Sequence, residues 1–268
     1  THLHTHSYFS LLDGAASPKQ LCETVANLGM DAMALTDHNT LAGAVRFFQA
    51  AQESKIRPII GVEFTVELAG DTILPQFDHP GFSSARSRSC RADTTSDYTR
   101  HAHLLLLAMD NEGYSNLCRL VTSARLGQAR YSGPFSEDFA RVDRKKPTLA
   151  QQHLRRYASH LLCLSGCAKG EVPRLVNAGK WRAAKTVADY YQQLFGEGNF
   201  YIELHNHLLP LPAAHLRYRL QELADDMQLP TVATNNVHYA TRDMAKAQDI
   251  LVCMRALQTV DEYHPDRK

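Results

Sequence analysis

SPKQLCETVANLGMDAMALTDH, residues 17–38, decides the fold, because it predicts one amphipathic helix followed directly by one buried strand. The helix begins after Ser17, a good N-cap residue, has Pro18 at its first position, and ends at Gly29. Apolar residues recur between these limits at helical spacing. DAMALTDH, residues 31–38, has the short apolar run of a strand that is covered on both faces. The stretch therefore indicates an architecture in which helices and strands alternate.

The same alternation continues along the chain. A second helix is predicted at 40–54 and the next strand at 57–68. The buried face of that helix is expected to carry Leu41, Ala44, Val45 and Phe48. Further strands are predicted at 102–108, 160–166, 199–205 and 231–236. Further helices are predicted near 112–126, 168–178, 180–195, 213–228 and 241–256.

Seven strands result once the opening residues, 1–6, are counted as the first of them. Strands that alternate with helices favour a parallel sheet. The pattern therefore predicts an α/β protein with a seven-stranded (β/α)7 barrel of the TIM-like kind, and an open doubly wound sheet is the alternative.

The length of the chain fits one domain, and its balanced charge gives no strong electrostatic field over the whole protein. The 268 residues carry 29 Lys and Arg against 28 Asp and Glu, a net charge of +1. The chain has neither the apolar run of a membrane span nor the features of a signal peptide, so we expect a cytoplasmic protein with no membrane partner. Residues 70–100, rich in Ser, Asp, Arg, Gly and Pro, are expected to form a surface insertion or mobile loop.

Side chains suited to metal binding fall at the ends of the predicted strands, where the catalytic groups of α/β barrels gather. His4 and His6 are two residues apart on one strand and therefore share a face. Imidazoles, carboxylates and a thiolate are ligands for zinc, manganese or iron. The candidate residues are His4, His6, Asp13, Asp37, His38, Glu63, His103, Cys167, His205, His207, Asn236 and His238.

Each candidate also has an ordinary structural explanation. A single histidine near a strand end is more often a hydrogen-bonded structural residue than a ligand, Cys167 alone would be a core thiol, and Glu63 alone an ion-pair partner. His205 and His207 are either a surface pair or substrate contacts. The coincidence of such residues at seven strand ends favours a metal centre, and the donors outnumber what one ion can use.

Five motifs in a fixed order carry a family resemblance: LHTHS followed by SLLDG, then ALTDHNTLAG, IIGVEF, LSGC and ATNNVHY. Together they resemble the polymerase and histidinol phosphatase (PHP) domain, in the form found at the N-terminus of the bacterial DNA polymerase III alpha subunit and its error-prone relatives. AMDNEGYSNLCRLVTSA and TVDEYHPDRK extend the resemblance over nearly all of residues 1–268, which would form a single PHP domain. The resemblance is weakest at 70–100 and 128–158.

The resemblance implies a distorted seven-stranded barrel that holds two or three divalent metal ions. These would be zinc and/or manganese, with iron or magnesium as alternatives. Asp37, His38 and Glu63 would be the catalytic residues, with Asp37 orienting a ligand imidazole. The implied metal ligands are His4, His6, Asp13, His38, Glu63, His103, Cys167, Asn236 and His238, whereas His2 falls outside the set.

Two implied ligands depart from the pattern of relatives. Asn236 stands where many relatives have Asp, so one metal is expected to bind less tightly, or catalysis to be reduced. Cys167 stands where the smaller phosphatases have a histidine, and its softer thiolate favours zinc over magnesium.

The expected reaction is phosphoester hydrolysis, because neighbouring metal ions can activate water and stabilise a leaving oxygen. With a DNA 3′ end as the substrate, the result would be 3′–5′ exonuclease trimming that proofreads a C-family DNA polymerase. The expected partners are this DNA end or another phosphoester, the remainder of the polymerase chain, and other replication or repair proteins. Basic residues that either follow a phosphate backbone or form only a solvated face are Arg141, Arg144, Lys145, Lys146, Arg155 and Arg156.

Polymerisation itself is not expected, because the chain has no Asp-x-Asp pair for two magnesium ions. Since the chain also lacks an initial Met and stops after TVDEYHPDRK, we expect an N-terminal piece of a polymerase. Two alternatives remain. The first is a catalytically weak or inactive module whose metals only stabilise the fold. The second is a free-standing phosphatase of small molecules such as histidinol phosphate.

Overall fold

The computed structural model describes residues 1–68, 101–126, 147–207 and 213–262. The expected surface insertion at 70–100 therefore lies outside the described residues. So do four of the basic residues considered for backbone contact, namely Arg141, Arg144, Lys145 and Lys146.

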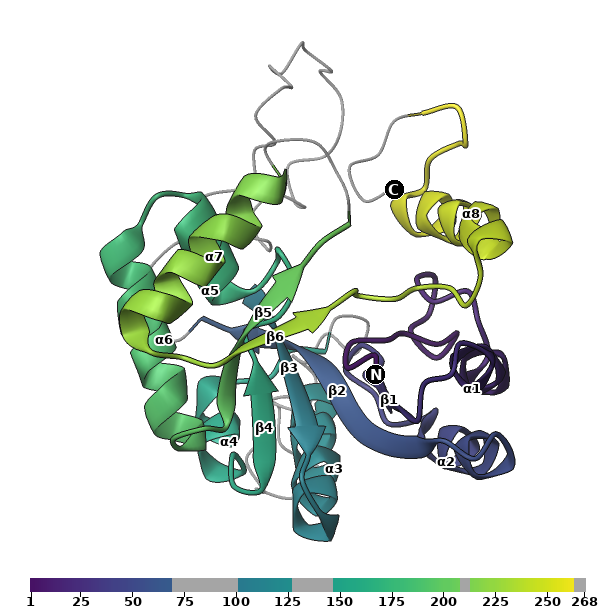
Figure 1. Ribbon diagram of the computed structural model, residues 1–268, viewed down its shortest axis with the longest axis horizontal. Coiled ribbons are helices and arrows are strands. Elements are labelled where there is room, and N and C mark those ends of the chain that lie inside the picture. The colour runs from purple at the N-terminus through teal and green to yellow at the C-terminus, as the bar shows by residue number, and fades with distance from the viewer. Residues whose placement is uncertain (69–100, 127–146, 208–212, 263–268) are drawn as a thin grey trace, which may run out of the picture.

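A curled sheet of six strands forms the middle of the protein, with each strand beside its neighbour in the sequence (Figure 1). The strands are β1 (Ala32–Leu35), β2 (Arg57–Glu67), β3 (His101–Ala108), β4 (Leu161–Leu164), β5 (Phe200–His205) and β6 (Thr231–Thr234).

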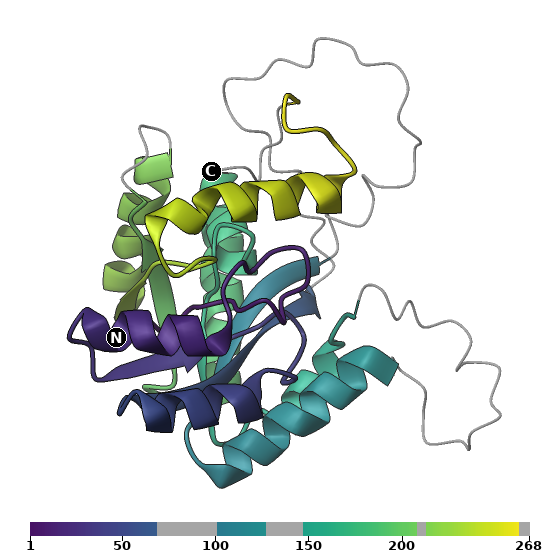
Figure 2. The same ribbon diagram turned by 90° about the vertical axis from the view of Figure 1, so that its right-hand side faces the viewer.

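Helices surround this sheet. Figure 1 shows α5, α6 and α7 on one side and α1 and α2 on the opposite side, while α8 lies apart from the others beyond α1. Figure 2 shows α8 running across the molecule above the loop that follows the opening residues. The helices are α1 (Pro18–Asn27), α2 (Ala44–Glu53), α3 (Asn111–Leu126), α4 (Gln151–Arg156), α5 (Glu171–Asn177), α6 (Trp181–Phe195), α7 (Ala213–Met227) and α8 (Ala245–Ala256), the last preceded by a short 3-10 turn, Arg242–Met244.

The first predicted helix forms as its sequence indicates. Ser17 accepts a hydrogen bond from the backbone of Gln20, and the Gln20 side chain accepts one in return from the backbone of Ser17. This reciprocal capping satisfies two amide groups that the first turn would otherwise leave without partners. Pro18 occupies the first turn, as predicted. The strand β1 then follows with all four residues buried.

The buried face of α2 differs from the prediction. Ala44 is buried as expected, but Val45 is 65% exposed and Phe48 is 48% exposed. The face that packs inward is formed by Ala44, Phe47, Ala50 and Ala51. The predicted face was assigned by helical spacing from Leu41, which lies before the first residue of the observed helix. The assignment therefore fell on the neighbouring face, which is exposed.

The α/β class is confirmed, but the prediction of seven parallel strands is wrong for β3. This strand runs antiparallel to both β2 and β4, whereas β1–β2, β4–β5 and β5–β6 are parallel pairs. A parallel pair needs a crossover connection, usually a helix. The sequence between β2 and β3 carries no amphipathic helix pattern, so the alternation on which the prediction rested is interrupted there.

Residues 1–6 contribute isolated bridges rather than a seventh strand. Thr5 bridges Val237 in parallel fashion, and the amide of His6 donates to the carbonyl of Val237 at 2.8 Å. On the other side, the amide of Thr36 donates to the carbonyl of Thr5 at 2.9 Å. The opening segment therefore lies between the end of β1 and the chain that follows β6.

Side chains of the strands alternate between the helix-covered outside of the sheet and the inside of its curl. On β3, Leu104 and Leu106 belong to the large apolar core against the helices. Leu105 belongs to a smaller apolar cluster on the opposite face. Glu63 of β2 pairs with Leu105 and therefore also lies on the inner face. The inside of the curl thus carries both apolar and ionisable side chains.

Replacing Leu106 with Ala should lower the free energy of unfolding by about 2–5 kcal/mol, because the leucine is fully buried in the large core and its removal leaves a cavity. Val45→Ala is the control, with an expected change of about 0.5 kcal/mol or less for an exposed position. Urea denaturation followed by circular dichroism measures both. Equal losses in the two variants would contradict the assignment of this core.

Candidate metal centre

Glu63 lies at the centre of a cluster of histidines and is 1% exposed. Its carboxylate oxygens are 2.9 Å from Nδ1 of His38 and 2.8 Å from Nδ1 of His103. Nε2 of His6 lies 3.3 Å away and Nε2 of His4 lies 3.6 Å away. One buried carboxylate is thus surrounded by imidazoles from the opening segment, the end of β1 and β3.

The direction of β3 explains how His103 reaches this cluster. His103 stands near the start of its strand, which in an all-parallel barrel would be the end away from the site. Because β3 is antiparallel to β2, His103 pairs with Thr65, two residues from Glu63. Cys167, which follows β4, completes this side of the cluster with its Sγ 3.5 Å from Nδ1 of His103 and 3.6 Å from Oε1 of Glu63.

A second carboxylate, Asp13, is joined to the first through His38. Nε2 of His38 lies 2.8 Å from Oδ2 of Asp13, and Nε2 of His238 lies 3.1 Å from the same oxygen. The other oxygen, Oδ1, accepts a hydrogen bond of 2.5 Å from Arg255 of α8. His38 therefore bridges the two acidic centres, and α8 is tied to one of them.

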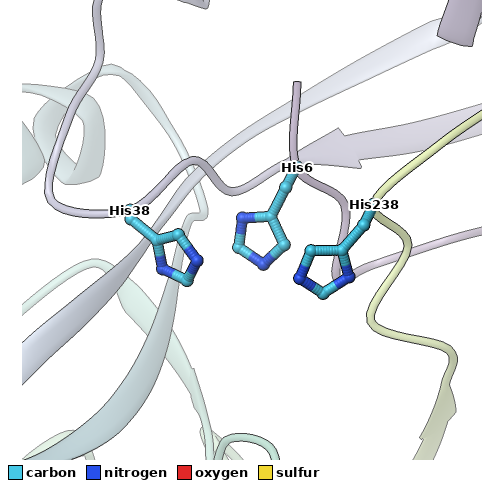
Figure 3. Close-up of side chains that lie close together, drawn as sticks. All are labelled: His6, His38 and His238. Carbon is cyan, nitrogen blue, oxygen red and sulfur yellow. The ribbon is translucent and has the colours of Figure 1, made fainter. Parts of the chain in front are cut away.

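Three of the histidines lie side by side although they come from distant parts of the chain. Figure 3 shows His6 between His38 and His238. The ring of His6 stacks on that of His38 with centroids 4.2 Å apart, and its centroid is 4.9 Å from that of His238.

Asp37 acts on the cluster through serines. It accepts hydrogen bonds from the backbone amide of Ser7 at 2.7 Å, from the Ser7 hydroxyl at 2.8 Å and from the Ser10 hydroxyl at 2.7 Å. Ser10 in turn lies 3.2 Å from Nδ1 of His6. The Asp37 carboxylate thus holds the loop after the opening segment and reaches the His6 imidazole through Ser10.

The buried, charged groups of the cluster strongly shift the pKa values of its histidines. Burial would lower the pKa of His4, but the carboxylates of Glu203 and Glu63 raise this pKa to about 10. Burial would likewise lower the pKa of His38, but Glu63 and Asp13 raise it to about 9. For His6 burial prevails, and its pKa lies well below the ordinary histidine value.

The pKa values of Glu63 and Cys167 shift in opposite directions. Burial would raise the pKa of Glu63, but His103, His38 and His4 hold it well below its ordinary value. Burial and the neighbouring Glu63 raise the pKa of the Cys167 thiol well above its ordinary value. Glu63 is therefore an ionised carboxylate stabilised by the cations around it, whereas Cys167 is a neutral thiol that a bound metal ion would deprotonate.

The donors fall into overlapping groups that could each hold a metal ion. Within the described ranges, four sets of three ligand atoms lie within 4.8 Å of one another. They are His6–His38–His238, His4–His6–Glu63, Glu63–His103–Cys167 and His4–Glu203–His205. Nε2 of His4 and Nε2 of His6 are both buried without a hydrogen-bond partner. Two buried nitrogen atoms in that condition fit metal coordination, so the residues present suit a metal centre.

Most of the predicted site residues come together in this cluster, although their roles as ligands remain predictions. Asn236 is placed differently: its Oδ1 is buried without a hydrogen-bond partner, and its backbone carbonyl lies 2.8 Å from Nδ1 of His238. His207 lies on the surface. The predicted residues that meet are His4, His6, Asp13, His38, Glu63, His103, Cys167 and His238.

Glu203, which is 1% exposed on β5, was not among the predicted site residues. Its Oε1 lies 2.7 Å from Nδ1 of His4 and 2.8 Å from Nε2 of His205. The signal that could have revealed it is the strand alternation in FYIELH, residues 200–205, which puts Glu203 and His205 on the same face.

Arg155 and Arg156, the two basic residues considered for backbone contact that the structure describes, have local partners. Nε of Arg155 donates to the hydroxyl of Tyr190 at 3.1 Å. The guanidinium of Arg156 lies 5.4 Å from the ring centre of Tyr157. Both arginines belong to α4.

An α/β fold that places a histidine-rich donor cluster on the inner face of a curled sheet defines a class of metal-site proteins. A model of one family in this class, the PHP domain, matches residues 2–207. The chain belongs to the PHP domain family.

Relatives of the chain are bacterial DNA polymerases. It is 39% identical to the error-prone DNA polymerase of Symbiobacterium thermophilum over 269 residues, which cover 99% of this chain and 22% of that protein. It is 36% identical to the DNA polymerase III subunit alpha of Treponema pallidum over 253 residues, which cover 94% of this chain and 19% of that protein. The chain thus spans about a fifth of the length of these relatives.

Among solved structures, an amidohydrolase from Chromobacterium violaceum is 14% identical, with 93% of this chain and 96% of that chain covered and a TM-score of 0.47.

Among the helices described for this chain, none is long and apolar enough to cross a membrane.

Replacing His6 with Ala should remove at least one bound metal ion per chain, because His6 belongs to two of the four donor groups. Plasma mass spectrometry of the purified protein measures the metal content. His160→Ala is the matched control, since His160 pairs with Asp110 outside the cluster, and it should leave the metal content unchanged. A folded His6→Ala protein with full metal content would contradict the assignment of His6 as a ligand.

Proposed function

We propose that this chain is the PHP domain of a bacterial C-family DNA polymerase and that it hydrolyses phosphoesters at a centre of two or three divalent metal ions. The observation that carries the proposal is the linkage of two buried carboxylates, Glu63 and Asp13, through His38. This linkage sets several donor groups side by side, as hydrolysis between neighbouring metal ions requires.

The substrate that we propose is the 3′ end of DNA, so that the reaction is 3′–5′ exonuclease trimming in support of proofreading. The relatives named DNA polymerases support this choice of substrate class. The remainder of a polymerase chain, together with other replication or repair proteins in the cytoplasm, would be the partners.

The exposed fraction of the side chain differs among the histidines of the cluster. The side chains of His4 and His6 are fully buried, whereas that of His38 is 27% exposed and that of His103 is 22% exposed. A phosphate group would therefore approach beside His38 and His103.

Metal ions in such a centre supply a nucleophile from water near neutral pH and offset the charge of the phosphate. The protein's own residues position these ions. Glu63 and His38 would ligate them, while Asp37 holds the loop that carries Ser7 and Ser10. Cys167 favours zinc in its group because a thiolate is a soft ligand, and the groups of imidazole and carboxylate also suit manganese.

A second candidate is a module whose metal ions stabilise the polymerase without catalysis. The observation that favours it is the amide at Asn236 in the chain that carries His238, where a carboxylate would be the stronger ligand. A DNA digestion assay separates the two candidates.

Glu63→Gln should abolish trimming of a 5′-labelled single-stranded DNA, because it removes the charge shared by the surrounding imidazoles. Gel electrophoresis of the products measures the activity. Glu67→Gln, on the same strand and outside the cluster, is the control and should trim as the unchanged protein does. Activity should vanish with a chelator and return with zinc or manganese. A protein that binds these metals without trimming DNA would favour the structural module.

Asn236→Asp should raise metal affinity or the rate of trimming several-fold, because a carboxylate is a stronger ligand than an amide for divalent ions. Titration with zinc and manganese, followed by the same digestion assay, measures both quantities. Asn206→Asp is a control for added charge near the site, since Asn206 is exposed after β5. Identical behaviour of Asn236→Asp and the unchanged protein would show that Asn236 does not limit the centre.

A further inference from the structure

We propose that Glu203 is a positioning residue that fixes His4 as a ligand through Nε2, an inference that rests on the metal centre proposed above. In this role a residue of β5 would orient the first of the two opening histidines, His4.

The two nitrogen atoms of His4 have distinct surroundings. Nδ1 donates to Oε1 of Glu203 at 2.7 Å, and both side chains are fully buried. Nε2 has no hydrogen-bond partner and faces Oε2 of Glu63 at 3.6 Å. In the neutral imidazole that a metal ion binds, a proton on Nδ1 leaves the lone pair on Nε2, so the contact with Glu203 selects the tautomer that can bind a metal ion beside Glu63.

Glu203 is itself held in place by contacts from its own strand, from β6 and from the turn after β4. Its Oε1 accepts hydrogen bonds from His205 at 2.8 Å and from the hydroxyl of Thr234 on β6. Its backbone amide donates to the hydroxyl of Ser165 at 2.9 Å. A carboxylate fixed in this way holds the imidazole of His4 at a defined angle, as precise metal coordination requires.

The second histidine of the opening motif has a different partner. Nδ1 of His6 donates a hydrogen bond to the hydroxyl of Ser10 at 3.2 Å, and that hydroxyl in turn donates a hydrogen bond to Asp37 at 2.7 Å. A charged partner raises the basicity of a ligand imidazole more than a hydroxyl does. The two histidines would therefore bind metal with different strength although they belong to one short motif.

The competing explanation is an additional metal ion held by His4, Glu203 and His205, which also form a donor group. Both His4 and His205 lie at hydrogen-bond distance from the same oxygen of Glu203. Two imidazoles that share one carboxylate oxygen are typical of hydrogen-bond donors around an acceptor. Nε2 of His4 then remains available to the donor group His4–His6–Glu63. Metal stoichiometry distinguishes the two explanations.

The test measures metal affinity in Glu203→Gln and Glu203→Ala by competition with a chelating dye for zinc and for manganese. We expect the affinity of one metal ion to fall by about 10- to 100-fold, with a larger loss for Ala than for Gln, and the stoichiometry at saturation to stay unchanged. Glu171→Gln is the matched control, because Glu171 is a buried glutamate that accepts a hydrogen bond from Tyr191 in the core. It should leave both affinity and stoichiometry unchanged.

A double-mutant cycle with His4→Ala makes the test specific. If Glu203 acts through His4, then Glu203→Gln should have little further effect in the His4→Ala protein. Unchanged affinity in Glu203→Gln, which preserves the size of the side chain, would overturn the proposal. So would a loss of one metal ion at saturation, because Glu203 would then be a ligand itself.

Circular dichroism confirms that each variant is folded, and Glu203→Gln alone decides the outcome if Glu203→Ala does not fold. Because no step of this test uses DNA, a protein that fails to trim DNA leaves the result intact. Failure of the proposed function and failure of this inference are therefore distinguishable.

Discussion

The buried carboxylate of Glu63 is the constraint on which the rest of the site depends. An ionised carboxylate in the interior is stable only when cations or hydrogen-bond donors surround it. Here the compensation comes from four histidines, which lie on the opening segment, after β1 and on β3. These segments must meet at Glu63 to compensate its charge. The curl of the sheet brings them together there, and it therefore also fixes the position of the donor cluster.

Much of this arrangement is encoded locally and could be predicted. The alternation of apolar runs with amphipathic helices predicted the α/β class and the approximate place of each strand. The opening His-x-His and the Asp-His after the first buried strand predicted residues that now lie beside Glu63. Such predictions succeed because parity along a strand and the position of strand ends depend on near neighbours in the sequence.

The parts that could not be predicted depend on distant pairing. The antiparallel direction of β3 places His103 at the site, yet no local pattern fixes how a strand pairs with its neighbours. Strand alternation in residues 200–205 puts Glu203 on the same face as His205, but only its contacts with His4 and Thr234, 199 and 31 residues away in the chain, show that this face belongs to the site. A glutamate in a strand is otherwise an ordinary surface residue.

The distribution of apolar and polar contacts bears on whether metal ions would serve stability or catalysis. The large core around Leu106 and the separate core around Phe47 lie against the helices and consist of apolar side chains. Burial of that kind is the dominant favourable term in folding. The donor cluster lies elsewhere, inside the curl, with His38 and His103 partly open to solvent on one side. A site used only to hold the fold together does not need that opening, whereas a substrate does, so the opening supports the proposed hydrolysis over the structural alternative.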